Sequence, residues 1–145
     1  MNTSRLVYQK AFDDIIRALA KLPQRIKLLA VGSGSDEAML KKLAEELGVA
    51  NRVVFAGQVS RDVVTLYRRA ADIFVAPSRS EGLGNAFLSA LASRLPLIAT
   101  QVGGMADYVF DEKHNPDKQP TAWVIDPNSP DQIIAKVQEI IANPE

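Results

Sequence analysis

Short runs of consecutive apolar residues recur along the chain, separated by segments with helical periodicity. The clearest runs are Ile26–Val31, Val53–Phe55, Ile73–Ala76, Leu97–Ala99 and Trp123–Ile125. Because these runs are continuous rather than alternating, they predict strands that are covered on both faces, as in a parallel sheet. The segment Arg5–Tyr8 predicts one further strand.

Between the runs, apolar residues recur at the three- and four-residue spacing of amphipathic helices. The predicted helices begin near Phe12, Ser35, Ser60, Asn85 and Ser129. The last opens with Ser129 as N-cap, Pro130 in the first helical position and Gln132 three residues after the cap. Alternating strands and helices predict an α/β fold, a doubly wound and mostly parallel sheet of about six strands.

Composition narrows the possible functions. The length of 145 residues suits one domain, and the 17 acidic residues balance the 17 basic ones, so electrostatics give no case for nucleic-acid binding. The absence of cysteine excludes disulfides and cysteine–zinc sites. No apolar stretch is long enough to span a bilayer, and no signal-peptide pattern is present. The chain begins almost directly in an element, so we expect that sequence is missing upstream.

The most informative segment is Pro77–Asn85, between a predicted buried strand and a predicted helix. In open α/β sheets, ligands bind where strands end at their carboxyl termini. Gly82 and Gly84 let the backbone approach a ligand, and the start of the helix offers free N–H groups to an anion. Glu81 does not suit a phosphate, because like charges repel. It suits neutral hydroxyls, such as those of a sugar attached to that phosphate.

Three other segments are candidate ligand contacts, each with a structural alternative. Arg5 and Lys10 could neutralise a diphosphate, or they are solvated surface charges. Gly32 begins a Gly-Ser-Gly turn that does not continue as a dinucleotide fingerprint, which favours a plain tight turn. The backbone near Val59 could pair with the edge of a base, or form only the turn into a capped helix.

The remaining chemistry-bearing residues give weaker signals. The pair Gly103–Gly104 follows a predicted strand and either lines the same crevice or simply begins a helix. His114 lies in the polar loop 111–120 and is expected to be solvated. Asp13 and Asp14 are adjacent on a predicted helix and should point apart. No pattern of metal ligands is present, so we predict no metal site.

Taken in order, several segments resemble the donor-binding, C-terminal half of the retaining group 1 (family 4-like) glycosyltransferases of the GT-B fold. These segments are Ala70–Ser78, Glu81–Gly84, Ala90–Thr100 and Val102–Gly104, with Ser4–Ala11, Val31–Gly34 and Val53–Gly57 also in place. The resemblance covers nearly the whole chain. The order of these segments is specific to the family, although each segment alone is only weak evidence for it.

The resemblance implies a Rossmann-like domain that binds a UDP-, GDP- or ADP-linked sugar for metal-independent transfer with retention of configuration, without a further cofactor. The implied catalytic residues are Glu81, Arg5 and Lys10. The implied donor-binding residues are Gly82, Leu83, Gly84, Asn85, Ser89, Val59 and Gly32. It also implies a cytoplasmic location, with any membrane contact made through a second domain.

The chain departs from the family pattern in three ways. Ser89 stands eight positions after Glu81, where the family has a second glutamate that grips the ribose. Ser4, Ala11 and Arg94 replace glycines that are usual in the family. The third departure is the absence of the acceptor-binding N-terminal domain.

We therefore expect residues 1–145 to form one nucleotide-sugar-binding domain that is inactive alone and works with an N-terminal domain or a partner chain. The alternatives are a non-catalytic or degenerate nucleotide-sugar-binding subunit and part of a nucleotide-sugar epimerase. A generic doubly wound domain that binds another phosphate compound is the remaining alternative.

Overall fold

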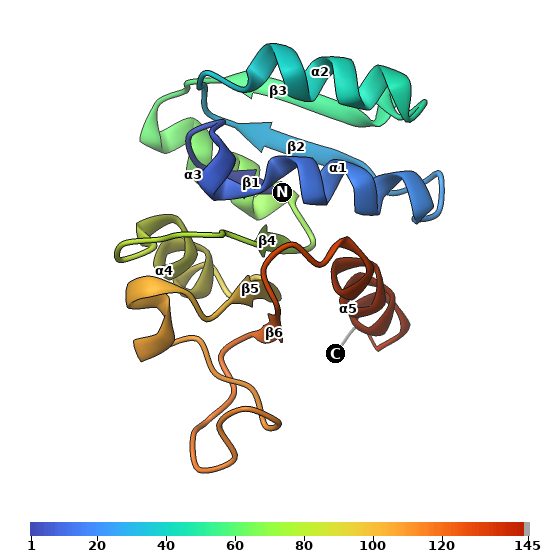
Figure 1. The fold of residues 1–145 in the computed structure, drawn as a ribbon. Helices are drawn as coiled ribbons and strands as arrows, with labels where there is room; N and C mark the ends of the chain where they lie inside the picture. The colour runs from blue at the N-terminus through green and yellow to red at the C-terminus, as the bar shows by residue number, and fades with distance from the viewer. Residues whose placement is uncertain (144–145) are drawn as a thin grey trace.

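The computed structural model describes residues 1–143, in which strands and helices alternate along an α/β fold (Figure 1). The strands are β1 (Asn2–Thr3), β2 (Leu28–Val31), β3 (Val53–Gly57), β4 (Phe74–Ala76), β5 (Leu97–Thr100) and β6 (Trp123–Ile125). The α-helices are α1 (Phe12–Lys21), α2 (Glu37–Glu46), α3 (Arg61–Ala70), α4 (Asn85–Ala92) and α5 (Pro130–Ala142). The 3₁₀ turns are η1 (Tyr8–Lys10), η2 (Ala50–Arg52) and η3 (Gly103–Asp107). In the described part of the chain, no helix has the length and apolar character needed to cross a membrane.

The strands form two parallel sheets of three strands, ordered β1-β2-β3 and β4-β5-β6. Their inner strands meet, because the Val75 amide donates to the Met1 carbonyl at 3.0 Å and the Met1 amino group donates to the Ile73 carbonyl at 2.6 Å. Across the molecule the order is therefore β3-β2-β1-β4-β5-β6. The predicted doubly wound, mostly parallel architecture is confirmed.

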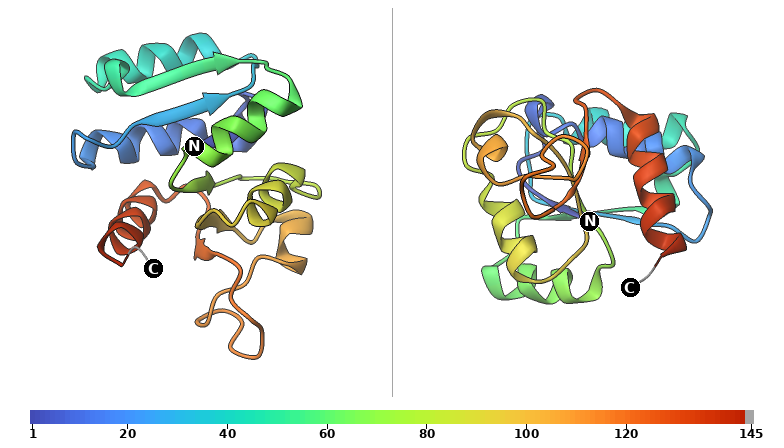
Figure 2. Two further views of the ribbon diagram at one scale, coloured as in Figure 1. Left: turned by 180° about the vertical axis from the view of Figure 1, so that it is seen from behind. Right: turned by 90° about the horizontal axis from the view of Figure 1, so that it is seen from below.

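Helices cover both faces of this layer of strands, with α1, α2 and α5 on one side and α3 and α4 on the other (Figure 2). Successive strand residues point to opposite faces, so Val75 enters one apolar cluster while Phe74 and Ala76 enter the other. Burial on both faces explains why the predicted strands read as continuous apolar runs.

The prediction of a strand at Arg5–Tyr8 is wrong. These residues lie in the loop after β1 and in the start of η1, and the strand itself is the two-residue segment Asn2–Thr3. Leu6 is fully buried, but its backbone N–H donates to the Ser33 carbonyl in the loop after β2, at 2.9 Å. The Leu6 side chain is therefore as buried as that of a strand residue, although its backbone does not form the hydrogen bonds of a sheet.

The helix starts predicted near Phe12, Ser60, Asn85 and Ser129 are confirmed, but only one of the two predicted capping serines makes a side-chain capping bond. Ser60 caps α3, and its hydroxyl accepts from the Val63 amide at 3.5 Å. Ser129 precedes α5 with Pro130 in the first turn, but its side chain makes no capping bond. Gln132 instead accepts from the Asp126 amide at 2.8 Å, so the predicted capping box does not form.

The segment 111–120 is a surface loop without regular secondary structure, as predicted. His114 is exposed there, and its Nδ1 lies 2.8 Å from a carboxylate oxygen of Asp111. Although burial acts to raise it, the hydrogen bonds from His114 hold the pKa of Asp111 below its usual value. His114 therefore stabilises the loop in which it lies, through its hydrogen bonds to Asp111.

Candidate functional site

The candidate site lies at the carboxyl ends of β1 and β4, where the order of the strands reverses. The chain leaves β1 into the loop 4–11 and leaves β4 into the loop 77–84. These loops contact each other through the Arg79 amide, which donates to the Gln9 carbonyl at 2.8 Å. A reversal of this kind opens the crevice in which doubly wound proteins bind their ligands.

Lys10 and Glu81 meet between these two loops. The Lys10 amine donates to Glu81 Oε2 at 2.5 Å, although 71 positions separate the two residues. Both side chains are mostly enclosed, at 14 % and 16 % exposure. The buried Ser78 hydroxyl donates to the same oxygen at 3.2 Å. Within residues 1–143, Oε1 of Glu81 has no hydrogen-bond donor, so this oxygen can accept from a ligand hydroxyl.

The loop that carries Glu81 leads directly into the N-terminus of α4. Gly84 has the left-handed conformation that favours glycine, with φ 69°, and precedes Asn85, the first residue of the helix. Gly82, Leu83 and Asn85 are exposed beside it. The unpaired N–H groups at a helix start attract anions, so this loop offers an anion site next to the carboxylate of Glu81.

Gly103 and Gly104 pack against the Glu81 loop. A Cβ at Gly103 would collide with the Glu81 carbonyl oxygen, and one at Gly104 would collide with the Gly82 carbonyl oxygen. The loop after β5 therefore packs directly against the backbone of the loop after β4 and supports it. Only residues without side chains permit this approach.

Tyr108 closes the same region. Its ring packs on Phe87 at a centroid distance of 5.6 Å, and its hydroxyl is buried without a hydrogen-bond partner among the described residues. A Cβ at Gly84 would lie 2.7 Å from this hydroxyl. Burial, reinforced by the negative charge of Glu81, raises the pKa of Tyr108.

Gly32 and Val59 lie on the β2 and β3 side of the crevice. The Gly32 amide donates to the Gly57 carbonyl at 2.8 Å, and a Cβ at Gly32 would collide with the Ser4 carbonyl oxygen. Gly32 thus lets the loop after β1 pass close to the loop after β2. The Val59 side chain is partly buried in the apolar cluster beneath α3 and α4.

The side chains of Arg5 and Ser89 form no hydrogen bond with Lys10 or Glu81 among the described residues. Arg5 is exposed, and its side chain forms no hydrogen bond or ion pair with any residue from 1 to 143. The Ser89 hydroxyl donates to the Asn85 carbonyl one turn earlier in α4, at 2.9 Å. The structure therefore brings Lys10 and Glu81 together, whereas the exposed guanidinium of Arg5 has no partner among residues 1–143.

Arg79 is a central residue of this region that the sequence interpretation missed. Its guanidinium forms a bidentate salt bridge with Asp13, in which both N–O distances are 2.9 Å, and it also donates to Asp14 at 3.1 Å. It also donates to the Tyr8 carbonyl at 2.8 Å and to Asn128 at 2.5 Å, and it lies over the Tyr8 ring. All five N–H donors of an arginine are thereby used, so Arg79 has none left for a phosphate.

The prediction that Asp13 and Asp14 point apart is wrong, because both reach Arg79. The hydrogen bond from Arg79 to Asp13 raises the pKa of the guanidinium, which stays charged. Burial raises the pKa of Asp14 in spite of the neighbouring positive charge. This cluster binds η1 and the start of α1 to the loop after β4, and so sets the position of Lys10.

Two of the residues that replace family glycines have a backbone that favours glycine. Ala11, between η1 and α1, has φ 54°, and Arg94, after α4, has φ 57°. A side chain in this left-handed region adds strain of about 1–2 kcal/mol. Ala11 is fully buried and Arg94 is exposed, so only Ala11 has packing that offsets the strain.

The comparisons with known proteins agree with one another. A family model described as "Glycosyl transferases group 1" matches residues 1–145. The chain is 34% identical over 141 residues to an uncharacterized glycosyltransferase of Methanocaldococcus jannaschii, covering 96% of this chain and 34% of that protein. It is 36% identical over 148 residues to a GDP-mannose-dependent alpha-(1-6)-phosphatidylinositol monomannoside mannosyltransferase of Mycobacterium tuberculosis, covering 95% of this chain and 37% of that protein.

Solved structures show the same fold. The Anabaena protein HepE, crystallised in complex with UDP, superposes with a TM-score of 0.84 at 23% identity, covering 99% of this chain and 39% of that chain. The present chain thus spans about a third of the length of the curated relatives it matches.

Proposed function

Because this chain belongs to the group 1 glycosyl transferases, we propose that it is their C-terminal, donor-binding domain and holds a nucleotide-diphosphate sugar for metal-independent transfer with retention of configuration. The observation that carries this proposal is the contact of Lys10 with Glu81 at the carboxyl ends of β1 and β4. This contact brings an amine beside a carboxylate next to the start of α4, which supports a diphosphate contact and a sugar contact side by side.

Each group in the crevice has a chemical role in this proposal. The Lys10 amine and the Arg5 guanidinium bind the diphosphate, together with the amides of Gly82, Leu83, Gly84 and Asn85 at the start of α4. Glu81 accepts hydrogen bonds from donor-sugar hydroxyls through the oxygen left free by Lys10 and Ser78. The Ser89 hydroxyl contacts the ribose, and backbone groups near Gly32 and Val59 line the nucleoside side.

These roles fit the chemistry of the transfer step. The bond between the anomeric carbon and the diphosphate oxygen breaks, and negative charge develops on the departing diphosphate. Fixed positive groups aimed at that charge stabilise the transition state. Lys10 is already held in place by its loop and by Glu81, so little reorganisation is needed when the charge forms.

In our proposal, a part of the enzyme outside this domain binds the acceptor. The chain spans about a third of its relatives' length, and a second domain or a partner chain supplies the acceptor side. The isolated chain should therefore bind the donor without transferring its sugar. The mannosyltransferase is named as GDP-mannose-dependent, whereas HepE was crystallised with UDP, so binding measurements must identify the base.

Calorimetric titration with UDP, GDP and ADP tests the binding proposal. At least one nucleotide should bind, and Lys10→Met should weaken that binding by about tenfold, because a charge-assisted contact to a phosphate is lost. Lys21→Met is the matched control, since Lys21 is exposed and pairs with Asp131 on α5. If none of the three nucleotides binds at millimolar concentration, the proposal is wrong.

Glu81 should discriminate between the nucleotide and the nucleotide-sugar. Glu81→Ala should weaken the sugar-linked donor at least fivefold more than the free nucleotide, because only the former has the hydroxyls that Glu81 accepts. Equal weakening of both ligands would exclude the sugar contact.

A non-catalytic nucleotide-sugar-binding subunit is the second candidate function, and one observation favours it. The Ser89 hydroxyl already donates to the Asn85 carbonyl, so it offers a ribose only its acceptor capacity. Transfer activity regained on adding an acceptor-binding partner would exclude this alternative.

A further inference from the structure

Two buried hydroxyl groups connect the interior of the sheet to the carboxylate of Glu81. Thr100, the last residue of β5, is fully buried, and its hydroxyl donates to the Ser78 carbonyl at 2.7 Å. Ser78 is 2% exposed, and its own hydroxyl donates to Glu81 Oε2 at 3.2 Å. We call Thr100 and Ser78 the hydroxyl relay, because together they link the central strand of the second sheet to the candidate site.

Neither hydroxyl of the relay is available to a ligand. A hydroxyl group has one hydrogen to donate, and in both residues this hydrogen is already used within the chain. Burial also keeps both side chains out of contact with a molecule that binds beside Glu81. Thr100 and Ser78 can therefore influence a ligand only through Glu81.

The main chain that carries the Ser78 hydroxyl is fixed by contacts on both sides. Thr100 pairs with Ile125 of β6, so the relay starts from a residue within the sheet. The carbonyl of Ser78 accepts from Thr100, and the N–H of the same peptide group, on Arg79, donates to the Gln9 carbonyl at 2.8 Å. With both polar groups of this peptide engaged, the sheet sets the position of the Ser78 hydroxyl.

Ser78 is the donor to Glu81 that a ligand does not compete for. The Lys10 amine donates to the same oxygen, Oε2, but in the proposed function this amine also binds the diphosphate of the donor. A bound diphosphate therefore competes with Glu81 for Lys10, since both are anions. The buried Ser78 hydroxyl keeps its bond to Oε2 in either state. Without that bond the Glu81 side chain would sample more rotamers whenever Lys10 turns to the ligand.

We propose that Ser78 and Thr100 are positioning residues for sugar recognition. They hold Oε2 of Glu81 while the diphosphate occupies Lys10, so that Oε1 stays available to the hydroxyls of the donor sugar. The inference rests on the proposed donor-binding function. It adds that orientation of Glu81 by the relay, rather than further charge, distinguishes a sugar-linked donor from the free nucleotide.

The test compares each free nucleotide with its sugar conjugate. Calorimetry with UDP and UDP-glucose, GDP and GDP-mannose, and ADP and ADP-glucose identifies the pair that the wild-type chain binds. Ser78→Ala should then weaken the conjugate about threefold more than the free nucleotide, because one hydrogen bond that orients Glu81 is lost. Ser80→Ala is the matched control, since Ser80 is an exposed serine in the same loop, and it should change neither affinity.

Variants of Thr100 separate positioning from a general loss of structure. Thr100→Val keeps the shape of the side chain without its hydroxyl and should weaken the conjugate about twofold more than the nucleotide. Thr100→Ser keeps the hydroxyl and should bind both ligands as the wild type does. Thermal melts followed by circular dichroism identify the variants that are folded at the titration temperature. If Ser78→Ala is unfolded there, the two Thr100 variants provide the same comparison.

A double variant tests whether the relay acts through Glu81. In a chain that already carries Glu81→Ala, Ser78→Ala should cause no further selective loss of the conjugate. A further selective loss would overturn the proposal, and so would equal weakening of conjugate and nucleotide by Ser78→Ala alone. Both results leave the donor-binding function standing when the wild-type chain binds a nucleotide. A wild-type chain that binds none of the six ligands overturns both proposals.

Discussion

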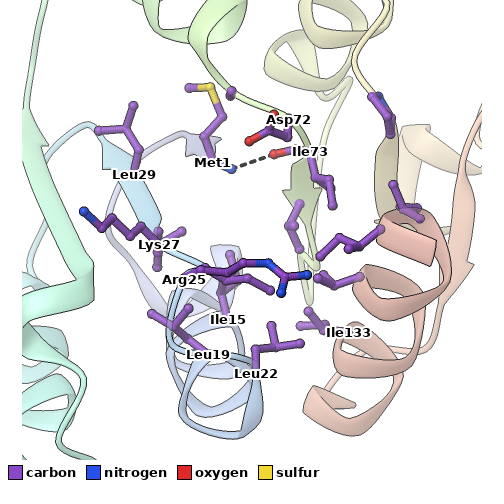
Figure 3. Close-up of a pocket in the computed structure, with 18 of the residues that line it drawn as sticks. Met1, Ile15, Leu19, Leu22, Arg25, Lys27, Leu29, Asp72, Ile73 and Ile133 are labelled. Carbon is purple, nitrogen blue, oxygen red and sulfur yellow. Dashed lines mark hydrogen bonds between the residues drawn. The ribbon is translucent and has the colours of Figure 1, made fainter. Parts of the chain in front are cut away.

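The two ends of β1 and β4 differ sharply, although the same two strands form both. At their carboxyl ends, loops converge and charged groups pair: Lys10 with Glu81, and Arg79 with Asp13 and Asp14. At their amino ends, aliphatic side chains such as those of Ile15, Leu19 and Leu22 line an apolar cavity (Figure 3). The carboxyl edge is thus organised by hydrogen bonds and ion pairs within the chain, whereas the amino edge is formed mainly by apolar side chains around the cavity. Substitutions at the two edges should have different consequences.

Loss of Arg79 should have the largest effect. Arg79→Ala leaves the buried carboxylate of Asp14 without its partner and should lower the free energy of unfolding by about 4 kcal/mol. Urea denaturation followed by circular dichroism measures this loss. Arg69→Ala, an exposed arginine on α3, should change stability by less than about 0.5 kcal/mol. A loss below about 1 kcal/mol for Arg79→Ala would show that the carboxyl edge does not depend on this cluster.

A pair of leucines compares the edges directly. Leu6→Ala, at a fully enclosed position of the carboxyl edge, should lower stability by about 3 kcal/mol through lost burial and a new cavity. Leu22→Ala should lower it by at least about 1 kcal/mol less, because Leu22 lines the apolar cavity at the amino edge and already lacks contacts on that side. Equal losses in urea denaturation would mean that Leu22 is packed as tightly in solution as Leu6.

Gly103 tests the close fit of the loops beneath Glu81. Gly103→Ala combines a left-handed backbone with a collision against the Glu81 carbonyl and should lower stability by about 2.5 kcal/mol. Gly48→Ala has the same sign of φ but open space around it, and should lower stability by about 1 kcal/mol. The main difference between the two variants is the collision with the Glu81 carbonyl oxygen. Equal shifts in melting temperature would therefore show that Gly103 does not support the Glu81 loop.

The two strained positions, Arg94 and Ala11, should respond differently to replacement by glycine. Arg94→Gly, before β5 at the amino edge, should raise stability by about 1 kcal/mol, because it removes strain without losing buried contacts. Ala11→Gly should be near neutral, since relief of strain is offset by the loss of a buried methyl group and by greater freedom of the unfolded chain. Thermal denaturation of both variants decides this, and a stabilised Ala11→Gly would contradict it.

The smallest effect is expected for the exposed hydrogen bond between Trp123 and Glu139. Trp123 donates to Glu139 at 2.9 Å, and the bonds from Lys136 and Trp123 lower the pKa of Glu139. A lowered pKa adds stability above the unfolded value of 4.5 that is lost as the pH falls through the folded value. Glu139→Gln should therefore lower stability by less than about 0.5 kcal/mol at pH 7, a small figure because Glu139 is largely solvated. In Trp123 fluorescence the difference should fade in acid, and a pH-independent difference would argue against this pair.

Much of the fold could be predicted because its strands are buried on both faces. The runs that became β2 to β6 are apolar throughout, and the helices between them carry a clear apolar stripe. β1 could not be predicted, since Asn2 and Thr3 are polar and only two residues pair. Leu6 and Val7 carried the apolar signal, but their backbone turns away from the sheet.

The site could be predicted only in part. Glycines and an acid at a strand end indicated the Glu81 loop, and the meeting of Lys10 with Glu81 fits the predicted cation beside that loop. Arg79 could not be identified, because its partners are 65 and 66 positions away in the sequence. Adjacent acids on a helix do not ordinarily converge, and here they do so because one guanidinium reaches both.

The support that Gly103 and Gly104 give to the Glu81 loop has a practical consequence for mutagenesis libraries. The tip of that loop has room to vary, since Gly82 has no neighbour within 4 Å of an added Cβ and Leu83 is 60% exposed. Libraries aimed at new donor preferences should diversify these two positions and hold the glycine pair constant, so that chemical diversity accumulates on an undisturbed scaffold.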